Sequence, residues 1–219
     1  MRVSTAALLL AGLAATAAHG ETAFTVDPDA GNNTFSAVFD AAVGERITAV
    51  TSAVGCALAV DEPAHSGHAS CSVPLTAIRV DNDDTKTEHF RQWATNGHGD
   101  PRQCAVELSV ARVTIPGPVE PMKPAVLSTD GTLTICGRRR DDRGAERITG
   151  TVTLLPPGAM RESRTLRIRA RIEGFDRERY QVGPKWTPGW LARVQELAPV
   201  VAMDGTIEVT LFATEATAK

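Results

Sequence analysis

The stretch Leu166-Arg167-Ile168-Arg169-Ala170-Arg171-Ile172 alternates apolar residues with arginines at every position. Successive side chains of a β-strand point to opposite faces of its sheet, so this stretch predicts a strand with one buried and one solvent-exposed face. The arginines would then form a solvated face, and a surface that meets anionic lipid is the alternative interpretation. Such a strand is typical of an antiparallel sheet.

The same two-residue period recurs on both sides of this stretch. It is found at residues 35–41, 106–110, 132–135, 148–154 and 207–213. With shorter segments between them, these indicate about eight strands. Eight antiparallel strands can close into a barrel that holds one small ligand. The sequence therefore predicts an all-β fold, an antiparallel eight-stranded barrel with one or two short helices.

Two short helices are predicted between the strands. Asp83 or Asp84 can cap a helix over residues 85–93, which we expect to lie on the barrel as a flap or lid. An irregular stretch rich in Pro and Gly, residues 183–190, leads into a second candidate helix over residues 191–197.

The first twenty residues have the pattern of a secretory signal peptide. Arg2 precedes an apolar run from Ala6 to Ala18, and small residues then offer cleavage sites. This run is shorter than the roughly 20 apolar residues that a membrane-spanning helix needs, and a buried N-terminal helix is the alternative. We therefore expect residues 1–20 to be removed and residues 21–219 to form a periplasmic or secreted domain that does not span a membrane.

Four cysteines follow the predicted signal peptide, at Cys56, Cys71, Cys104 and Cys136. An even number of cysteines in an oxidising compartment favours disulfide bonds. The sequence holds no Cys-x-x-Cys pair, so zinc-ribbon, thioredoxin-like and c-type haem sites lack the spacing that they require.

The expected strand register suggests how the cysteines pair. If Val60 pairs with Gly67 across the turn at residues 61–67, Cys56 lies directly opposite Cys71, at the Cβ separation of a cross-strand pair. The other two cysteines flank the Pro-rich connection at residues 114–124, on two further candidate neighbours. We therefore predict the disulfides Cys56–Cys71 and Cys104–Cys136.

Composition and motifs argue against several classes of function. The chain has 219 residues and a net charge of −3, which does not support a broad nucleic-acid-binding surface. No nucleophile elbow, P-loop or dinucleotide fingerprint occurs. His65 and His68 are three residues apart, but we interpret them as turn residues rather than metal ligands. The protein is therefore predicted to be a non-enzyme, with no catalytic residue, metal site or cofactor.

Small residues occupy many positions that should face the barrel interior: Ala37, Ala41, Gly150, Ala170 and Ala213. A barrel lined by such residues would not fill itself, and empty apolar volume is costly unless a guest occupies it. The pattern therefore favours a lipophilic small molecule as ligand.

Two of the three tryptophans, Trp186 and Trp190, lie in the Pro/Gly stretch. They either plug one end of the barrel or line the rim of an apolar ligand entrance, because indole tolerates a half-wet position. Both interpretations remain open at this stage.

Several stretches occur in a familiar order and spacing. They are FTVDP at 24–28, NTFSAVF at 33–39, GCALAVD at 55–61, KTEHFR at 86–91, GTLTICG at 131–137, FDRERY at 175–180 and DGTIEVTL at 204–211. In these stretches the chain resembles the YceI-like family of bacterial periplasmic, lipocalin-like polyisoprenoid-binding proteins, from about residue 24 to 215. It departs from the family at Lys86-Thr87, where the family has Arg and an acidic residue, and at Cys136, where it often has His.

The resemblance implies a non-enzymatic carrier of a long apolar molecule such as a polyisoprenoid, a quinone or a fatty amide. It implies that Phe35 and Phe39 line the tunnel, and that His89 and Arg91 hold the ligand head group. For His89, packing of the helix onto the barrel rim is the alternative.

Two other classes of function compete with a carrier. One is a disulfide-stapled structural or adhesion module whose core is filled, and the other is a secreted hydrolase that uses His89. For the oligomeric state, a two-fold homodimer is the default expectation for a small exported barrel.

Overall fold

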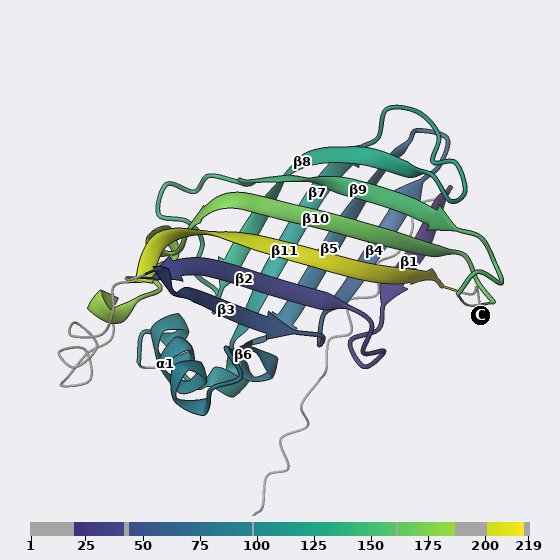
Figure 1. The fold of residues 1–219 in the computed structure, drawn as a ribbon. Coiled ribbons are helices and arrows are strands. Elements are labelled where there is room, and N and C mark those ends of the chain that lie inside the picture. Colours follow the sequence, from purple (N-terminus) through teal and green to yellow (C-terminus); the bar gives the residue numbers. More distant parts are fainter. Residues whose placement is uncertain (1–19, 42–43, 98, 161, 187–200, 217–219) are drawn as a thin grey trace, which may run out of the picture.

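The computed structural model describes residues 20–41, 44–97, 99–160, 162–186 and 201–216. In these residues the chain forms one antiparallel sheet of eleven strands, one α-helix and several short 3-10 helices (Figure 1). The prediction of an all-β fold is confirmed. The predicted signal peptide, apart from Gly20, and the second candidate helix at 191–197 lie outside the described residues.

The strands are β1 (Glu21–Val26), β2 (Thr34–Ala41), β3 (Arg46–Thr51), β4 (Gly55–Asp61), β5 (Ser66–Pro74), β6 (Arg79–Val80), β7 (Ala105–Thr114), β8 (Pro124–Ile135), β9 (Glu146–Leu155), β10 (Thr165–Asp176) and β11 (Val201–Glu215). The α-helix is α1 (Asp84–Thr95), and the 3-10 helices are η2 (Leu75–Ala77), η3 (Pro101–Gln103), η4 (Arg177–Tyr180) and η5 (Pro184–Trp186). No helix in the described ranges is long and apolar enough to cross a membrane.

Eight of the strands close into the predicted barrel. The order β1-β4-β5-β7-β8-β9-β10-β11 returns to its start, because the end of β11 pairs with β1. The same edge of β11 pairs along its first part with β2, so β2, β3 and β6 branch from the barrel as an extension. Helix α1 lies beside β3 and β6 at one end of the barrel (Figure 1). This branch, which the sequence did not predict, positions the cavity described below.

Strand β10 contains the stretch of alternating Leu, Ile and Arg. Leu166 and Ile172 are buried, whereas Arg169 and Arg171 are exposed, so the predicted alternation is confirmed. A bulge at Gly174, where φ is +65°, then shifts the register by one residue. Because of this shift, Phe175 points inward and is buried.

The small residues of the predicted interior have different roles. Ala37 and Ala213 are buried in the core, as expected. At Gly150, a Cβ atom would lie 2.0 Å from the carbonyl oxygen of Arg169. Glycine is therefore needed there for the close approach of β9 and β10, and the expectation that it leaves space inside the barrel is wrong.

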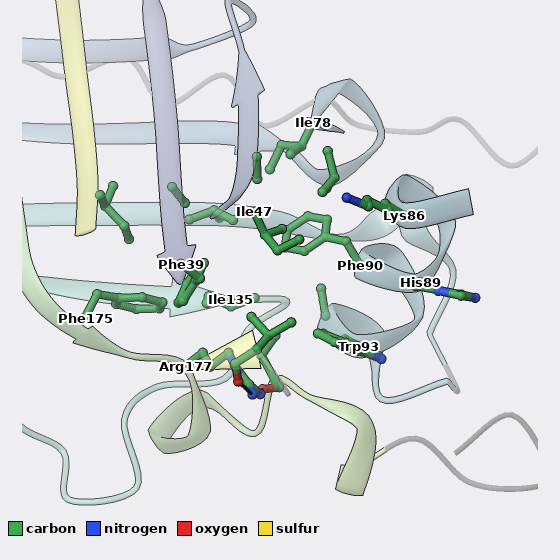
Figure 2. Close-up of a pocket in the computed structure, with 18 of the residues that line it drawn as sticks. Phe39, Ile47, Ile78, Lys86, His89, Phe90, Trp93, Ile135, Phe175 and Arg177 are labelled. Carbon is green, nitrogen blue, oxygen red and sulfur yellow. Dashed lines mark hydrogen bonds between the residues drawn. The ribbon is translucent and has the colours of Figure 1, made fainter. Parts of the chain in front are cut away.

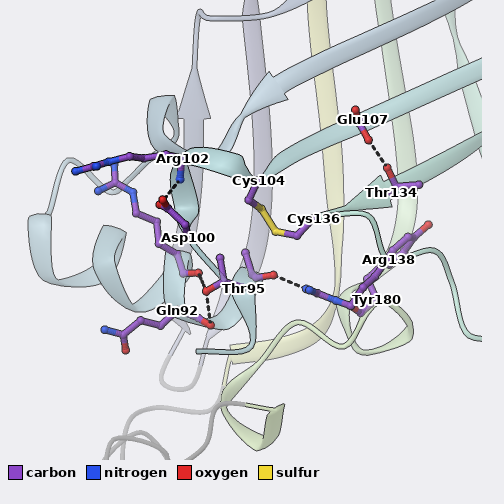
Figure 3. The surroundings of a disulfide bond; sticks show 12 residues. Gln92, Thr95, Asp100, Arg102, Cys104, Glu107, Thr134, Cys136, Arg138 and Tyr180 are labelled. Atoms are coloured by element: carbon purple, nitrogen blue, oxygen red, sulfur yellow. Dashed lines mark hydrogen bonds between the residues drawn. A yellow bond between two sulfur atoms is a disulfide. The ribbon is translucent and has the colours of Figure 1, made fainter. Parts of the chain in front are cut away.

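Both predicted disulfides are present. Val60 pairs with Gly67 in the β4–β5 hairpin, and Cys56 lies directly opposite Cys71, with Cα atoms 4.1 Å apart. Cys104 precedes β7 and bonds to Cys136, which follows β8, with Cα atoms 4.5 Å apart (Figure 3). The second disulfide therefore joins two neighbouring strands at the end of the barrel near α1.

Candidate ligand-binding cavity

A cavity of about 440 Å³ lies between α1, the β2–β3–β6 extension and the ends of β7 and β8. Its lining is mostly apolar, and Figure 2 shows these side chains converging from the strands and the helix. The apolar side chains labelled there are Phe39, Ile47, Ile78, Phe90, Trp93, Ile135 and Phe175. A space of this size and character lies within the usual range of small-molecule sites.

The pairing of β2 with β3 explains why there is space at this wall. Ala37 lies directly opposite Ala49, and both are buried and line the cavity. The next inward pair is Phe39 with Ile47, which bounds the space on one side. Because small residues face each other across the two strands, the wall recedes between larger neighbours.

Helix α1 covers this wall and is anchored by its first turn. Asp83 is the N-cap, and its carboxylate accepts the backbone N–H of Lys86 at 2.9 Å, which lowers the pKa of Asp83. Thr87 is buried, and its hydroxyl accepts the backbone N–H of Val80 at 3.0 Å. This bond ties the helix to β6 and turns Phe90, one helical turn further on, toward the cavity (Figure 2).

A second anchor holds the end of α1. The Arg138 guanidinium donates to the carbonyl oxygen of Ala94 and, at 3.1 Å, to that of Tyr180 (Figure 3). It therefore links α1 to η4, and burial lowers its pKa. This role of Arg138 is not readable from the sequence, because the two hydrogen bonds join residues that are 44 and 42 positions apart.

Among the described residues, Lys86 and Arg177 are the two cations that line the cavity, and their surroundings differ. The Nζ atom of Lys86 lies 2.8 Å from a carboxylate oxygen of Asp81 and 2.7 Å from one of Glu45. These hydrogen bonds raise the pKa of Lys86, which therefore stays charged and is neutralised by its neighbours. Arg177 is 8% exposed, and within the described part of the chain it donates only to backbone carbonyl oxygens, those of Val182, Val201 and Ala202.

Arg177 also lies 5.6 Å from the centroid of the Trp93 ring, a cation–π contact that joins η4 to α1. Burial lowers its pKa. Arg177 was not predicted as a site residue, although it falls within the FDRERY stretch that resembles the family pattern.

The wall formed by Phe175 is held by a buried polar contact behind it. Tyr180 is fully buried, stacks on Phe175 with ring centroids 5.3 Å apart, and donates its hydroxyl to Glu146 at 2.7 Å. Burial raises the pKa of Tyr180, and the hydrogen bond to Glu146 adds to this shift. The Glu146 carboxylate also accepts a hydrogen bond from the Arg140 guanidinium at 3.1 Å, so the negative charge of Glu146 is paired.

The structure brings together three of the six predicted ligand contacts. Phe35, Phe39 and His89 all line the cavity. Phe39 meets Phe175 edge to face at 6.1 Å, whereas Figure 2 shows the His89 side chain directed away from Phe90 and Phe39. Among the described residues, none forms a hydrogen bond with the His89 imidazole.

Of the other three predicted contacts, Arg91 lies outside the cavity lining, and neither the side chain of Trp186 nor any part of Trp190 is among the described features. Arg91 donates to the carbonyl oxygen of Thr76 at 2.8 Å and is not part of the cavity lining. Trp186 is the last residue of η5, and Trp190 lies outside the described residues. A role in ligand binding remains a prediction for each of them.

A second, smaller apolar space of about 60 Å³ lies deeper in the barrel. Phe35, Val106 and Ile207 line both spaces, so they form the boundary between them. We call these three residues the waist. The interior is thus a main cavity under α1 and an inner space beyond the waist.

Within the described residues, no group of three His, Cys, Asp or Glu side chains is placed to hold a metal ion. His65 lies in the β4–β5 turn and has a positive φ of 48°, as expected for a turn residue. His68 is part of β5, with its Nδ1 atom 3.8 Å from Glu21.

Comparison with known proteins shows the fold. The chain is similar in structure to a polyisoprenoid binding domain from Saccharophagus degradans implicated in plant cell wall breakdown. The two share 12% sequence identity, with a TM-score of 0.59 over 89% of this chain and 99% of that chain. No protein-family model matches the sequence, and no curated protein matches it.

Proposed function

We propose that this protein is a non-enzymatic carrier of the YceI-like type, which sequesters or transports one long-chain apolar ligand. The ligand would be a polyisoprenoid, a quinone or a fatty amide. The observation that carries this proposal is the cavity of about 440 Å³, which is lined by apolar side chains and covered by α1. The similarity in fold to a polyisoprenoid binding domain supports it.

Burial of the hydrocarbon chain would supply the binding energy. Each methylene moved from water into the cavity stabilises the complex by about 0.8 kcal/mol, so about ten methylenes provide roughly 8 kcal/mol before the costs of association. The side chains that would surround such a chain are Phe39, Ile47, Phe90 and Phe175. Few polar contacts are then required for useful affinity.

Export fits the same proposal. We propose that residues 1–20 are a signal peptide and that residues 21–219 form the periplasmic or secreted lipid-binding domain. Two disulfides support this location, because they persist in oxidising compartments. N-terminal sequencing of the protein from the periplasm tests it, and a protein that stays in the cytoplasm with Met1 retained would contradict it.

The ligand test is purification without detergent from a bacterial host, followed by extraction and lipid mass spectrometry. We expect a chain lipid at close to one molecule per protein. Phe39→Asp should abolish it by placing a charge in the cavity wall, whereas Val50→Asp, on the outer face of β3, should retain it. An empty extract, also after polyprenyl lipids are added, would contradict the carrier and favour a structural module.

A further inference from the structure

Arg177 is a buried positive charge on the wall of the main cavity. Among the described residues, its three hydrogen-bond partners are backbone carbonyl oxygens, at 2.8 Å for Val182, 2.9 Å for Val201 and 3.0 Å for Ala202. Within the same part of the chain, no carboxylate oxygen lies within 4.0 Å of its guanidinium. Asp176 and Glu178 attract this charge from a greater distance, and each forms an ion pair elsewhere, with Arg179 and with Lys185. Because a buried charge is costly without a counter-charge in contact, this position favours a further anion.

The guanidinium also has donors to spare. Arginine carries five N–H groups, and the three carbonyl oxygens use one each on Nε, Nη1 and Nη2. One N–H on each Nη atom therefore has no acceptor among the residues that the structure describes. The three hydrogen bonds and the Trp93 ring hold the group in one orientation, so binding a further acceptor needs little reorganisation.

The other cation of the lining provides a direct contrast. Lys86 is also on the cavity wall, but Asp81 and Glu45 both contact its Nζ atom within 2.8 Å. An anionic ligand gains little from a charge that two carboxylates already neutralise. Of the two, Arg177 is the cation whose charge is left for a ligand.

We propose that the ligand carries a carboxylate head group, and that Arg177 binds this head group while the chain lies along the apolar lining. This inference rests on the proposed function and extends its ligand class from polyisoprenoids, quinones and fatty amides to long-chain fatty acids. Guanidinium and carboxylate are matched in geometry, since two N–H donors can meet two oxygens, and such charge-assisted bonds are stronger than neutral ones. Figure 2 shows Arg177 at the edge of the cavity, near Phe39 and Trp93.

The experiment compares four ligands with the same sixteen-carbon chain on the mature, disulfide-bonded protein at pH 7.5. Hexadecanoic acid, hexadecanamide, hexadecanol and hexadecylamine each displace a fluorescent apolar probe. We expect the acid to bind about tenfold or more tighter than the alcohol, and the amine to bind most weakly. Equal binding of acid, amide and alcohol would overturn the head-group inference but leave the carrier intact, whereas no binding of any ligand would overturn the carrier itself.

Variants of the two cations test whether Arg177 is the source of the preference for the acid over the alcohol. Arg177→Gln should weaken the acid about tenfold and leave the alcohol within about twofold, while Arg177→Lys should keep part of the preference. Lys86→Gln is the matched control, because it removes a cation that is already paired, and it should leave the order of ligands unchanged. If Lys86→Gln abolishes the preference for acid while Arg177→Lys retains it in full, the assignment is wrong. These two variants decide the question even if Arg177→Gln does not fold.

Discussion

Ala37 on β2 lies directly opposite Ala49 on β3, and both side chains are buried on the wall of the main cavity. Cross-strand neighbours have Cβ atoms about 5 Å apart, so two methyl groups leave a shallow recess where larger residues would meet. The recess lies opposite α1, which carries Phe90 and Trp93 into the same space. The cavity thus depends on two small residues that are paired across neighbouring strands of the sheet.

Filling this recess should remove ligand binding without unfolding the protein. In Ala49→Leu, the larger side chain occupies space that the ligand would take, so we expect the affinity for a fluorescent fatty probe to fall at least about tenfold. The melting temperature should stay within a few degrees or rise, because the new side chain fills a cavity. Val50→Leu, the next residue on the outer face of β3, is the control. Unchanged binding in Ala49→Leu would mean that the ligand lies elsewhere.

Phe35 at the waist should set the longest chain that the protein accepts. Phe35→Ala would join the main cavity to the inner space, so the affinity should keep rising for chains longer than the wild-type limit. Each additional buried methylene should raise the affinity about fourfold. Titration with saturated chains of increasing length measures this limit.

The same variant should lose about 3 kcal/mol of unfolding free energy, as expected for Phe→Ala at a buried position. Leu133→Ala is its control, because Leu133 lines only the inner space and leaves the waist closed. An identical chain-length limit in Phe35→Ala and wild type would contradict this role for Phe35.

The two disulfides should differ in their effect on stability. In the chain-entropy model, the loop closed by Cys56–Cys71, with a separation of 15, contributes about 3 kcal/mol, and the one closed by Cys104–Cys136, with a separation of 32, contributes about 4 kcal/mol. Urea unfolding of the two double-serine variants measures these values. If removal of Cys56–Cys71 costs more, strain or residual structure outweighs loop entropy.

Loss of the Cys104–Cys136 bond should also weaken ligand binding. Val106 and Ile135, which pair across β7 and β8 within two residues of this disulfide, both line the cavity. The other disulfide contributes to the inner space alone, through Cys71. Probe affinity that falls more in the Cys104/Cys136 variant than in the Cys56/Cys71 variant, at a temperature where both are folded, would confirm this difference.

Removing the Tyr180 hydroxyl should destabilise the protein by about 1–2 kcal/mol. Tyr180→Phe keeps the ring stacked on Phe175 but withdraws the hydrogen bond to buried Glu146. Thr134→Val, which removes an exposed hydroxyl bond to Glu107, is a control that should cost much less. Denaturant unfolding measures the loss of unfolding free energy in Tyr180→Phe and in Thr134→Val. Equal losses would show that the buried hydrogen bond contributes no more to stability than the exposed one.

Because of Asp142, the free energy of unfolding should decrease as the pH falls from about 4 to 2. Hydrogen bonds from Arg140 and from the backbone N–H of Gly144 lower its pKa to about 2, from a usual value of 3.8. The folded protein therefore holds the charged form more strongly than the unfolded chain does. This contribution is fully present above about pH 4 and is lost as the pH falls through 2. Urea midpoints of wild type and Asp142→Asn should differ above pH 4 and converge near pH 2; a constant difference would contradict this assignment.

Local sequence was sufficient for much of the fold. The period of two residues identified β10 and its buried face, because the direction of each side chain in a strand depends only on its position. The register of the β4–β5 hairpin followed from its turn, and with it the Cys56–Cys71 bond. The N-cap of α1 was readable to within one residue, as Asp83 or Asp84, since a cap acts on the next three residues, and the structure has Asp83.

The candidate site could be predicted only in part. Strand alternation placed Phe35 and Phe39 on one face, and the family resemblance implied that they line a tunnel; both line the cavity. Arg91 is on the same helix as Phe90, but the rotation of α1 on the barrel depends on the bond between Thr87 and Val80, which joins two elements. That rotation places the Arg91 guanidinium on the carbonyl of Thr76, outside the lining.

The sequence by itself determined most of the strands, the inward face of β10, the first helix and the Cys56–Cys71 bond, because these depend on neighbours within a few residues or across one turn. It also predicted the Cys104–Cys136 bond, from two segments that flank one connection. Only the tertiary structure decided that β2 leaves the closed barrel to form an extension, that Ala37 meets Ala49, and that Arg177 is buried without a described carboxylate partner. These features depend on contacts between segments far apart in the chain. Their free energy comes from burial and pairing that exist only once the barrel has closed.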